Sequence, residues 1–109
     1  MNQAIVSQNN VDTEGRPAGG LTTGTGLRIE WQNGPLVDPE TGERKLPNGA
    51  FVEGVITAAL HRIQHYQSSQ FSCRENALAI TKLEEALHWL NARTERRTIQ
   101  GVEGTHEGN

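Results

Sequence analysis

Hydrophobic and polar residues first alternate in the short run LRIEW. Leu27, Ile29 and Trp31 fall on one side of an extended backbone, while Arg28 and Glu30 fall on the other. A period of two is typical of a strand that has one buried face. The chain therefore begins its patterned region with a half-buried strand.

Turn signals follow this strand directly. Asn33-Gly34 predicts a tight hairpin turn, because both residue types tolerate a positive φ. Pro35 weakens the return strand and favours an edge position. A second turn, DPETGE, precedes the run RKL, which we expect to pair as a short strand. Two or three short antiparallel strands over about residues 27–46 are the expected result.

The pattern changes to a helical period in PNGAFVEGVITAALHRIQHYQ. It predicts a helix over about residues 50–67 with Asn48 as the N-cap, and with Phe51 and Tyr66 near its two ends. Its apolar stripe consists of Val52, Val55, Ile56, Ala59, Leu60 and Ile63.

A second helix is predicted over about residues 73–97. Ser72 as N-cap and Glu75 three positions later form a capping box, and Phe71 stands where a hydrophobic staple residue would. Its apolar face consists of Ala79, Ile80, Leu83, Ala86, Leu87 and Leu90.

These patterns predict an α+β fold, in which a short antiparallel β-hairpin or meander is followed by an antiparallel two-helix hairpin. Residues 1–26 are polar and rich in glycine, so we expect a flexible N-terminal arm there. Residues 27–109 are expected to form a single domain that ends in a polar tail over 98–109. The spacing of Gly19 and Gly24 resembles a phosphate-binding loop, but Thr25 stands where that motif needs lysine.

Composition limits the classes of protein that fit. Most of the large apolar residues lie between Leu27 and Leu90, so the core is small, and oligomerisation is a common way for such chains to bury more surface. A net charge of −3 argues against DNA binding. Cys73 is the only cysteine, which fits a reducing cytosol, and no run of residues is long and apolar enough to predict a membrane span.

The late part of the second predicted helix carries Arg93, Arg96 and Arg97. One interpretation is favourable interaction with the helix dipole together with solubility. The other is an anion clamp, because Arg93 and Arg97 are four residues apart on one face and guanidinium groups suit phosphate oxygens.

Three residues near the junction of the helices could recognise a nucleobase. Asn76 lies in the first helical turn, where it is either an auxiliary cap or a carboxamide that reads a base edge. Tyr66 and Phe71 flank the junction, and each is either a packing residue or a ring on which a base stacks.

A geometric constraint connects these two groups of residues. Asn76 and Arg93 are seventeen residues apart on one helix, which corresponds to about 25 Å. No small nucleotide reaches both within one chain. If they share a ligand, two chains must pack with these helices antiparallel, and a two-fold dimer would then hold two equivalent sites.

Other candidate chemistry is weaker. His61 and His65 have the i,i+4 spacing of metal ligands, but Arg62 replaces the glutamate of an HExxH motif, so no metal is expected. Cys73 beside Arg74 could have a lowered pKa, but no base or oxyanion hole is placed near it. We expect no enzyme activity and no cofactor.

The strings GPL, NGAFVEGVITAALHRIQHYQ, FSCRENALAITKLEEALHWLNARTERR and GVEGTH resemble the helical-hairpin family of phage nucleotide sponges. Within it, the chain is similar to the first family of Thoeris anti-defence proteins, which is related to the phage anti-CBASS sponges. The resemblance covers about residues 27–107, and the run CRENALAITKLEEALHWLN is its most specific part.

The resemblance implies a protein without catalysis that assembles as a homodimer or homohexamer in the host bacterial cytoplasm. It implies sequestration of glycocyclic ADP-ribose, the signal made by bacterial TIR-domain enzymes. Some members also hold cyclic di- or trinucleotides of CBASS signalling, so these are further expected ligands.

The resemblance also assigns binding residues. The family's base-contacting aromatic residue corresponds to Tyr66, its asparagine to Asn76, and its two late-helix arginines to Arg93 and Arg97. An arginine from the strand region corresponds to either Arg44 or Arg28. The alternative function is a helical-hairpin interaction module that binds an acidic protein partner.

Overall fold

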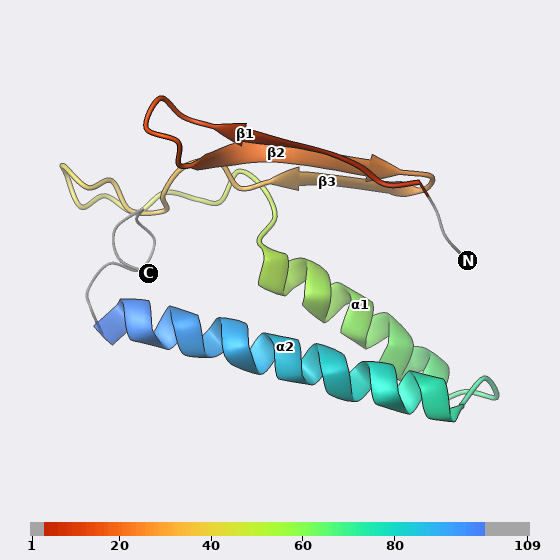
Figure 1. The fold of residues 1–109 in the computed structure, drawn as a ribbon. Coiled ribbons are helices and arrows are strands. Elements are labelled where there is room, and N and C mark those ends of the chain that lie inside the picture. Colours follow the sequence, from red (N-terminus) through yellow and green to blue (C-terminus); the bar gives the residue numbers. More distant parts are fainter. Residues whose placement is uncertain (1–3, 100–109) are drawn as a thin grey trace. The chain divides into compact units, whose positions relative to one another are not determined.

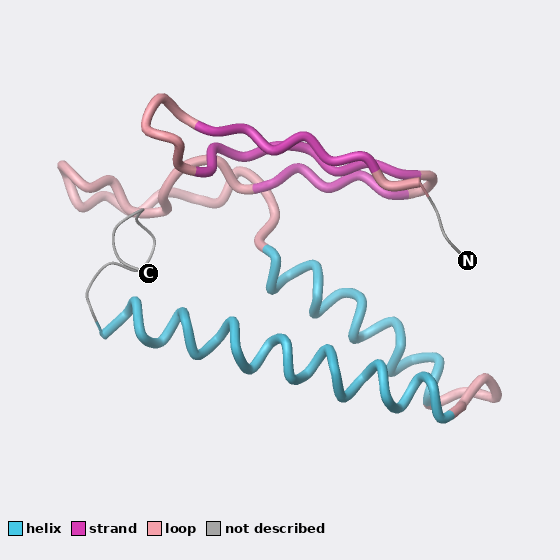
Figure 2. Tube along the Cα trace, viewed as in Figure 1, coloured by secondary structure: helices cyan, strands magenta, loops and turns pink. Residues whose placement is uncertain are grey.

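The computed structural model describes residues 4–99 of the chain. The described chain forms two compact units, a strand unit that ends at Phe51 and a helical unit that begins at Val52 (Figure 1). The fold class predicted from the pattern is confirmed, because three antiparallel strands precede two helices in an α+β arrangement (Figure 2).

The strand unit is a three-stranded antiparallel sheet in the order β1-β2-β3. Its strands are β1 (Val6–Val11), β2 (Pro17–Gly24) and β3 (Leu27–Trp31). Thr22 is the buried residue at its centre. The Trp31 indole Nε1 donates a hydrogen bond to Thr22 Oγ1 at 2.8 Å, and the Ser7 and Thr22 hydroxyls are 3.0 Å apart. Hydrogen bonds between side chains therefore link all three strands.

The N-terminal residues differ from the sequence expectation. Residues 1–26 were expected to form a flexible arm, but most of this segment lies in β1 and β2. The turn between these strands is held by Asp12, whose carboxylate accepts hydrogen bonds from the backbone N–H groups of Arg16 and Glu14. These bonds, first of all that from Arg16, lower the pKa of Asp12. Backbone pairing and turn chemistry order a segment that has little apolar surface to bury.

The prediction of a hairpin turn at Asn33-Gly34 is also wrong. Gly34 has the expected positive φ of 85°, but Asn33 does not. No return strand follows; instead, Ala50 comes back beside β3, donating to the Glu30 carbonyl at 2.7 Å and accepting from Gln32 N–H at 3.0 Å. A type I′ turn needs a positive φ at both central residues, so a wider loop forms here.

Asn48 closes this wider loop instead of capping a helix. Its Oδ1 accepts from the Asn33 N–H at 2.8 Å, and its Nδ2 donates to the Asn33 carbonyl at 2.9 Å. The run RKL was expected to pair as a short strand, but it forms no strand; Arg44 makes only an isolated antiparallel bridge with Val37.

The helical unit is an antiparallel hairpin of α1 (Val52–Gln67) and α2 (Arg74–Ile99), which lie side by side in Figures 1 and 2. Leu60 on α1 is the buried hydrophobic residue, with 7% of its surface exposed. Val55, Ile56 and Ile63 are partly buried beside it, whereas Val52 and Ala59 of the predicted stripe are exposed. All six residues predicted for the apolar face of α2 are partly buried.

Neither helix within the described residues has the length and apolar character needed to cross a bilayer.

Two glycine substitutions test this packing in opposite directions. Gly20 has a φ of +146°, and an added Cβ would overlap the Gln8 carbonyl oxygen across the β1–β2 pair. We expect Gly20→Ala to open this pair, so amide hydrogen exchange in β1 should accelerate at least about tenfold. Unchanged exchange in β1 of Gly20→Ala would contradict the close approach of the two strands.

Gly54 on α1 has open space around it, and Gly54→Ala should stabilise the helix by about 0.5–1 kcal/mol.

Candidate functional site at the mouth of the helical hairpin

The turn between α1 and α2 is built by side chains that bond to the backbone. The Ser69 hydroxyl donates to the Tyr66 carbonyl and accepts from the Phe71 N–H at 3.1 Å. Gln67 Oε1 accepts from the Cys73 N–H at 3.0 Å. These bonds satisfy the backbone at the end of α1 and in the turn, so they hold the turn in one conformation.

The first turn of α2 is capped one residue later than predicted. The helix begins at Arg74, and the Asn76 N–H donates to Cys73 Sγ at 3.4 Å, so Cys73 occupies the N-cap position. The capping box expected from Ser72 and Glu75 is therefore wrong by one residue. A thiol is a weak acceptor, and nothing in the usual cap preferences indicates cysteine here.

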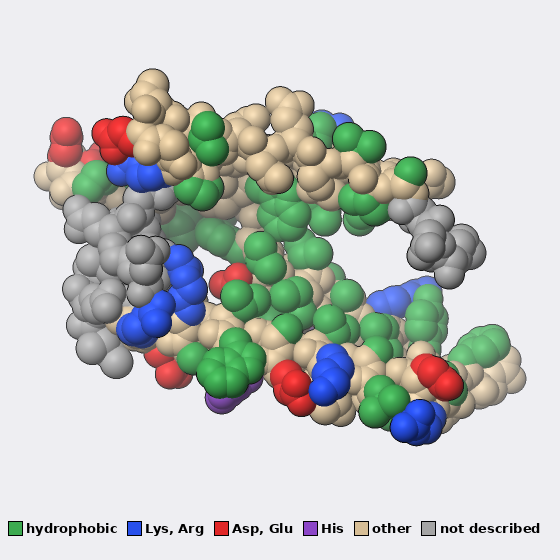
Figure 3. Space-filling model, viewed as in Figure 1, with side chains coloured by type: hydrophobic (Ala, Val, Ile, Leu, Met, Phe, Trp, Pro, Cys, Tyr) green, Lys and Arg blue, Asp and Glu red, His purple; other side chains and the backbone are tan. Residues whose placement is uncertain are grey.

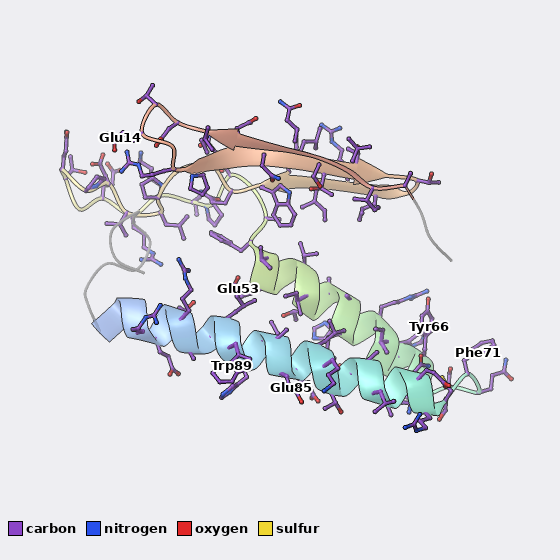
Figure 4. The ribbon with its side chains drawn as sticks, viewed as in Figure 1. Glu14, Glu53, Tyr66, Phe71, Glu85 and Trp89 are labelled. Atoms are coloured by element: carbon purple, nitrogen blue, oxygen red, sulfur yellow. The ribbon has the colours of Figure 1, made fainter. Side chains whose placement is uncertain are left out.

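An open pocket of about 430 Å³ lies at this end of the hairpin, lined by Tyr66, Phe71, Cys73 and Asn76. Figure 4 shows the Tyr66 and Phe71 side chains at the same end of the helical unit. Tyr66 has 38% of its surface exposed and Phe71 has 67%. Phe71 is thus too exposed for the staple role, and both rings are open to a ligand.

The side chain of Asn76 has a structural role in this pocket. Its Nδ2 donates to the Phe71 carbonyl at 3.1 Å, which ties the helix to the turn. Asn76 Oδ1 and the second amide hydrogen make no hydrogen bond within the described residues. The residue therefore supports the turn and still offers one acceptor and one donor, so both sequence interpretations of Asn76 fit the geometry.

Arg62 is a member of this site that the sequence interpretation missed. Its Nε donates to the Tyr66 hydroxyl at 3.1 Å, and its guanidinium carbon lies 5.0 Å from the centroid of the Tyr66 ring. The two residues are four apart on α1, which is the spacing that brings helical side chains together. This spacing is the signal that could have identified Arg62, which orients the ring and adds positive charge beside the pocket.

The other predicted site residues lie elsewhere in the chain. Arg93 is exposed on α2 and makes no ion pair with a described residue, and the Arg97 side chain lies outside the part of the chain that the structure describes. Arg28 pairs with Glu30 at 3.3 Å in the strand unit, which also contains Arg44. One chain therefore brings together Tyr66, Phe71 and Asn76, but not Arg93, which is seventeen residues further along the unbroken helix α2.

Among the described residues, no group of three or more His, Cys, Asp and Glu side chains is arranged to hold a metal ion. The pocket instead offers two aromatic rings, a carboxamide and a nearby guanidinium. These groups can stack on a flat ring and form hydrogen bonds with its edge.

The site is thus a helical hairpin with two exposed aromatic rings and a carboxamide at its mouth. Residues 24–95 match the family described as the Acb2/Tad1 hairpin domain, and the chain belongs to this family. It is also similar to a curated protein named Thoeris anti-defense 1 from Bacillus phage SBSphiJ7, with 49% identity over 79 residues. The family resemblance seen in the sequence is thereby confirmed.

That alignment covers 72% of this chain and 51% of the phage protein. The chain thus spans about half the length of the curated relative that it matches. The match of residues 24–95 begins at the last residue of β2, so β1 and nearly all of β2 lie outside the family domain.

The bond from Asn76 to the turn gives a prediction about stability. Asn76→Ala removes a partly exposed hydrogen bond, so we expect the free energy of unfolding to fall by about 0.5–1.5 kcal/mol. Asn91→Ala is a matched control on an exposed part of the same helix and should change stability by less than about 0.5 kcal/mol. Urea unfolding at one fixed protein concentration measures both. Equal effects of the two substitutions would contradict the role of Asn76 in the turn.

Proposed function

We propose that this protein is a phage anti-defence protein that sequesters a cyclic ADP-ribose signal without altering it. The expected ligand is glycocyclic ADP-ribose, made by TIR-domain enzymes in the host bacterial cytoplasm. Membership of the Acb2/Tad1 hairpin-domain family and similarity to a protein named Thoeris anti-defense 1 support this role.

The observation that carries the proposal is the pocket at the hairpin mouth. Tyr66 and Phe71 offer exposed rings, and Asn76 lines the same pocket. A purine can stack on such a ring, at a typical gain of about 1–3 kcal/mol per base. Its edge can exchange hydrogen bonds with the carboxamide.

A cyclic ADP-ribose also carries a diphosphate, which needs cations. Arg62 adds one guanidinium beside Tyr66, and Arg93 and Arg97 are the residues proposed to bind the phosphate oxygens. Because Arg93 lies about 25 Å from Asn76 along α2, these arginines come from a second copy whose α2 runs antiparallel. Two copies related by a two-fold axis then form two equivalent sites, and Arg44 or Arg28 supplies a further cation.

Sequestration requires tight binding of the signal but no catalysed reaction. A protein that holds the signal tightly lowers the free concentration available to the immune effector by mass action, and release returns the ligand intact. We also propose that the protein binds cyclic di- and trinucleotides at a further site, which would form in a homohexamer.

Titration calorimetry with the two glycocyclic ADP-ribose isomers tests the proposal, followed by heat release and chromatography of the ligand. We expect tight binding near one ligand per chain and recovery of unaltered ligand. Cleaved ligand would contradict sequestration without catalysis. Failure to bind either isomer would contradict the proposed ligand, and a protein captured through the arginines would favour the acidic-partner function instead.

Arg93 gives the sharpest prediction for this site. Arg93→Ala removes a charge-assisted contact to phosphate, so we expect the dissociation constant to rise by about 10- to 100-fold. Arg96→Ala is the matched control, because it removes a second exposed arginine from the same helical turn that is not assigned to the site. Calorimetry of both folded variants measures the difference, and equal losses would remove Arg93 from the site.

A further inference from the structure

Of the two rings at the hairpin mouth, only that of Tyr66 carries a hydroxyl group. Tyr66 is also the only tyrosine of the chain. Its side chain lines the open pocket together with Phe71, and 38% of its surface is exposed. Stacking of a base needs the ring alone, so a phenylalanine would serve equally well. The stacking role therefore leaves the hydroxyl of Tyr66 unexplained.

Arg62 holds this hydroxyl in place. The two residues are four apart on α1, and Arg62 Nε donates to the Tyr66 hydroxyl oxygen at 3.1 Å. The guanidinium carbon lies 5.0 Å from the centre of the Tyr66 ring, and the His65 ring lies 6.1 Å from it. Figure 3 shows a cationic side chain beside apolar ones at this end of the helical unit. These contacts fix the position of the ring and of its hydroxyl oxygen.

The hydrogen of the Tyr66 hydroxyl group remains available. A phenolic hydroxyl can accept one hydrogen bond and donate another. Here the oxygen accepts from Arg62, and among the described residues the hydroxyl has no acceptor for its own hydrogen. Tyr66 lines the pocket, whereas Arg62 does not. A hydrogen that turns away from Arg62 can therefore be donated to a ligand in the pocket.

The charge of Arg62 determines which acceptor suits this hydrogen. A hydroxyl that accepts a hydrogen bond from a guanidinium group is polarised, so it becomes a stronger donor. Arg62 also forms no ion pair with another described residue, so its positive charge is not compensated there. Both effects favour an anionic oxygen over a neutral acceptor.

We propose that the Tyr66 hydroxyl donates a hydrogen bond to a phosphate oxygen of the bound nucleotide, and that Arg62 is the residue that positions this hydroxyl. The inference rests on the proposed function, because it concerns the same ligand. The hydroxyl lies at the edge of the ring, so it reaches a group beside the stacked base. The ligand class that fits is a compact nucleotide, in which a phosphate lies close to the base.

Two substitutions of Arg62 separate its hydrogen bond from the rest of its side chain. The amide nitrogen of glutamine is as many bonds from Cα as Arg62 Nε, so Arg62→Gln keeps a donor without the charge, whereas Arg62→Met keeps a stem without a donor. We expect the dissociation constant for glycocyclic ADP-ribose to rise about tenfold in Arg62→Met and only about threefold in Arg62→Gln. Gln64→Met places a methionine at an exposed position of the same helix and should leave the affinity unchanged.

Tyr66→Phe removes the hydroxyl and keeps the ring. We expect its dissociation constant to rise about tenfold, and Arg62→Met and Arg62→Gln should bind equally well in this background. A residue that only stabilised α1 would instead weaken binding by the same factor with either ring. Phosphorus NMR of the bound ligand identifies the acceptor, because loss of the hydrogen bond should shift a phosphate resonance in Tyr66→Phe.

A measurement without ligand separates this inference from the proposed function. Isotope-labelled tyrosine reports on Tyr66 alone, and its ring resonances should shift in Arg62→Met but stay closer to wild type in Arg62→Gln. Unchanged resonances in Arg62→Met would overturn the positioning role, whatever the protein binds.

Ligand binding then tests the hydroxyl itself. Equal affinities of Tyr66→Phe and the wild type, or unchanged phosphorus resonances, would overturn its contact with phosphate and leave the proposed function intact. A wild-type protein that binds no cyclic ADP-ribose would contradict the proposed function and the phosphate contact with it, but not the positioning of Tyr66 by Arg62.

Discussion

The length of α2 is the constraint on which the rest of this protein depends. From Arg74 to Ile99 the helix is continuous, so it separates the residues at its start from those at its end by a fixed distance. A flexible linker between Asn76 and Arg93 would let one chain fold around a ligand, but a helix cannot bend in that way. The proposed division of one site between two copies follows directly from this rigidity.

The hairpin mouth adds preorganisation to that constraint. Side chains of Gln67, Ser69 and Asn76 bond to the backbone of the turn, and Arg62 supports the Tyr66 ring. A binder that must hold its ligand tightly gains from such order, because less conformational entropy is lost on binding. The hydrophobic core is small, since Leu60 is the buried hydrophobic residue of the helical unit within the described chain. Surface left open on one chain is then available for a second copy.

Periodicity predicted the helical hairpin well, because an amphipathic stripe such as Ala79 to Leu90 records directly which side is covered. It failed for residues 4–24, whose strands are held by backbone pairing and by Asp12 rather than by apolar burial. It also failed at Asn33-Gly34, where the strand partner is Ala50, far along the chain. Local turn preference could not show that a distant residue would compete for the same edge.

The candidate site shows the same division. Tyr66, Phe71 and Asn76 come together as their positions near one turn indicated, and the pocket confirms that proximity. The cap at Cys73 and the support from Arg62 depend on side-chain conformations that spacing alone leaves open. The residues proposed to share a ligand with Arg93 lie on a second copy of the chain, so the structure of one chain does not show them.

Complementation between two weakened variants tests most directly whether one site uses two copies. Tyr66→Ala and Arg93→Ala are each expected to raise the dissociation constant for the ligand by at least about tenfold, because every site in either homodimer lacks one contact. In a mixed dimer, Tyr66 of one copy meets Arg93 of the other, so one of its two sites is intact. Coexpression of the two variants, followed by calorimetry, should therefore restore wild-type affinity at about a quarter of the sites. No recovery, in a sample shown to contain mixed dimers, would contradict a site shared between two copies.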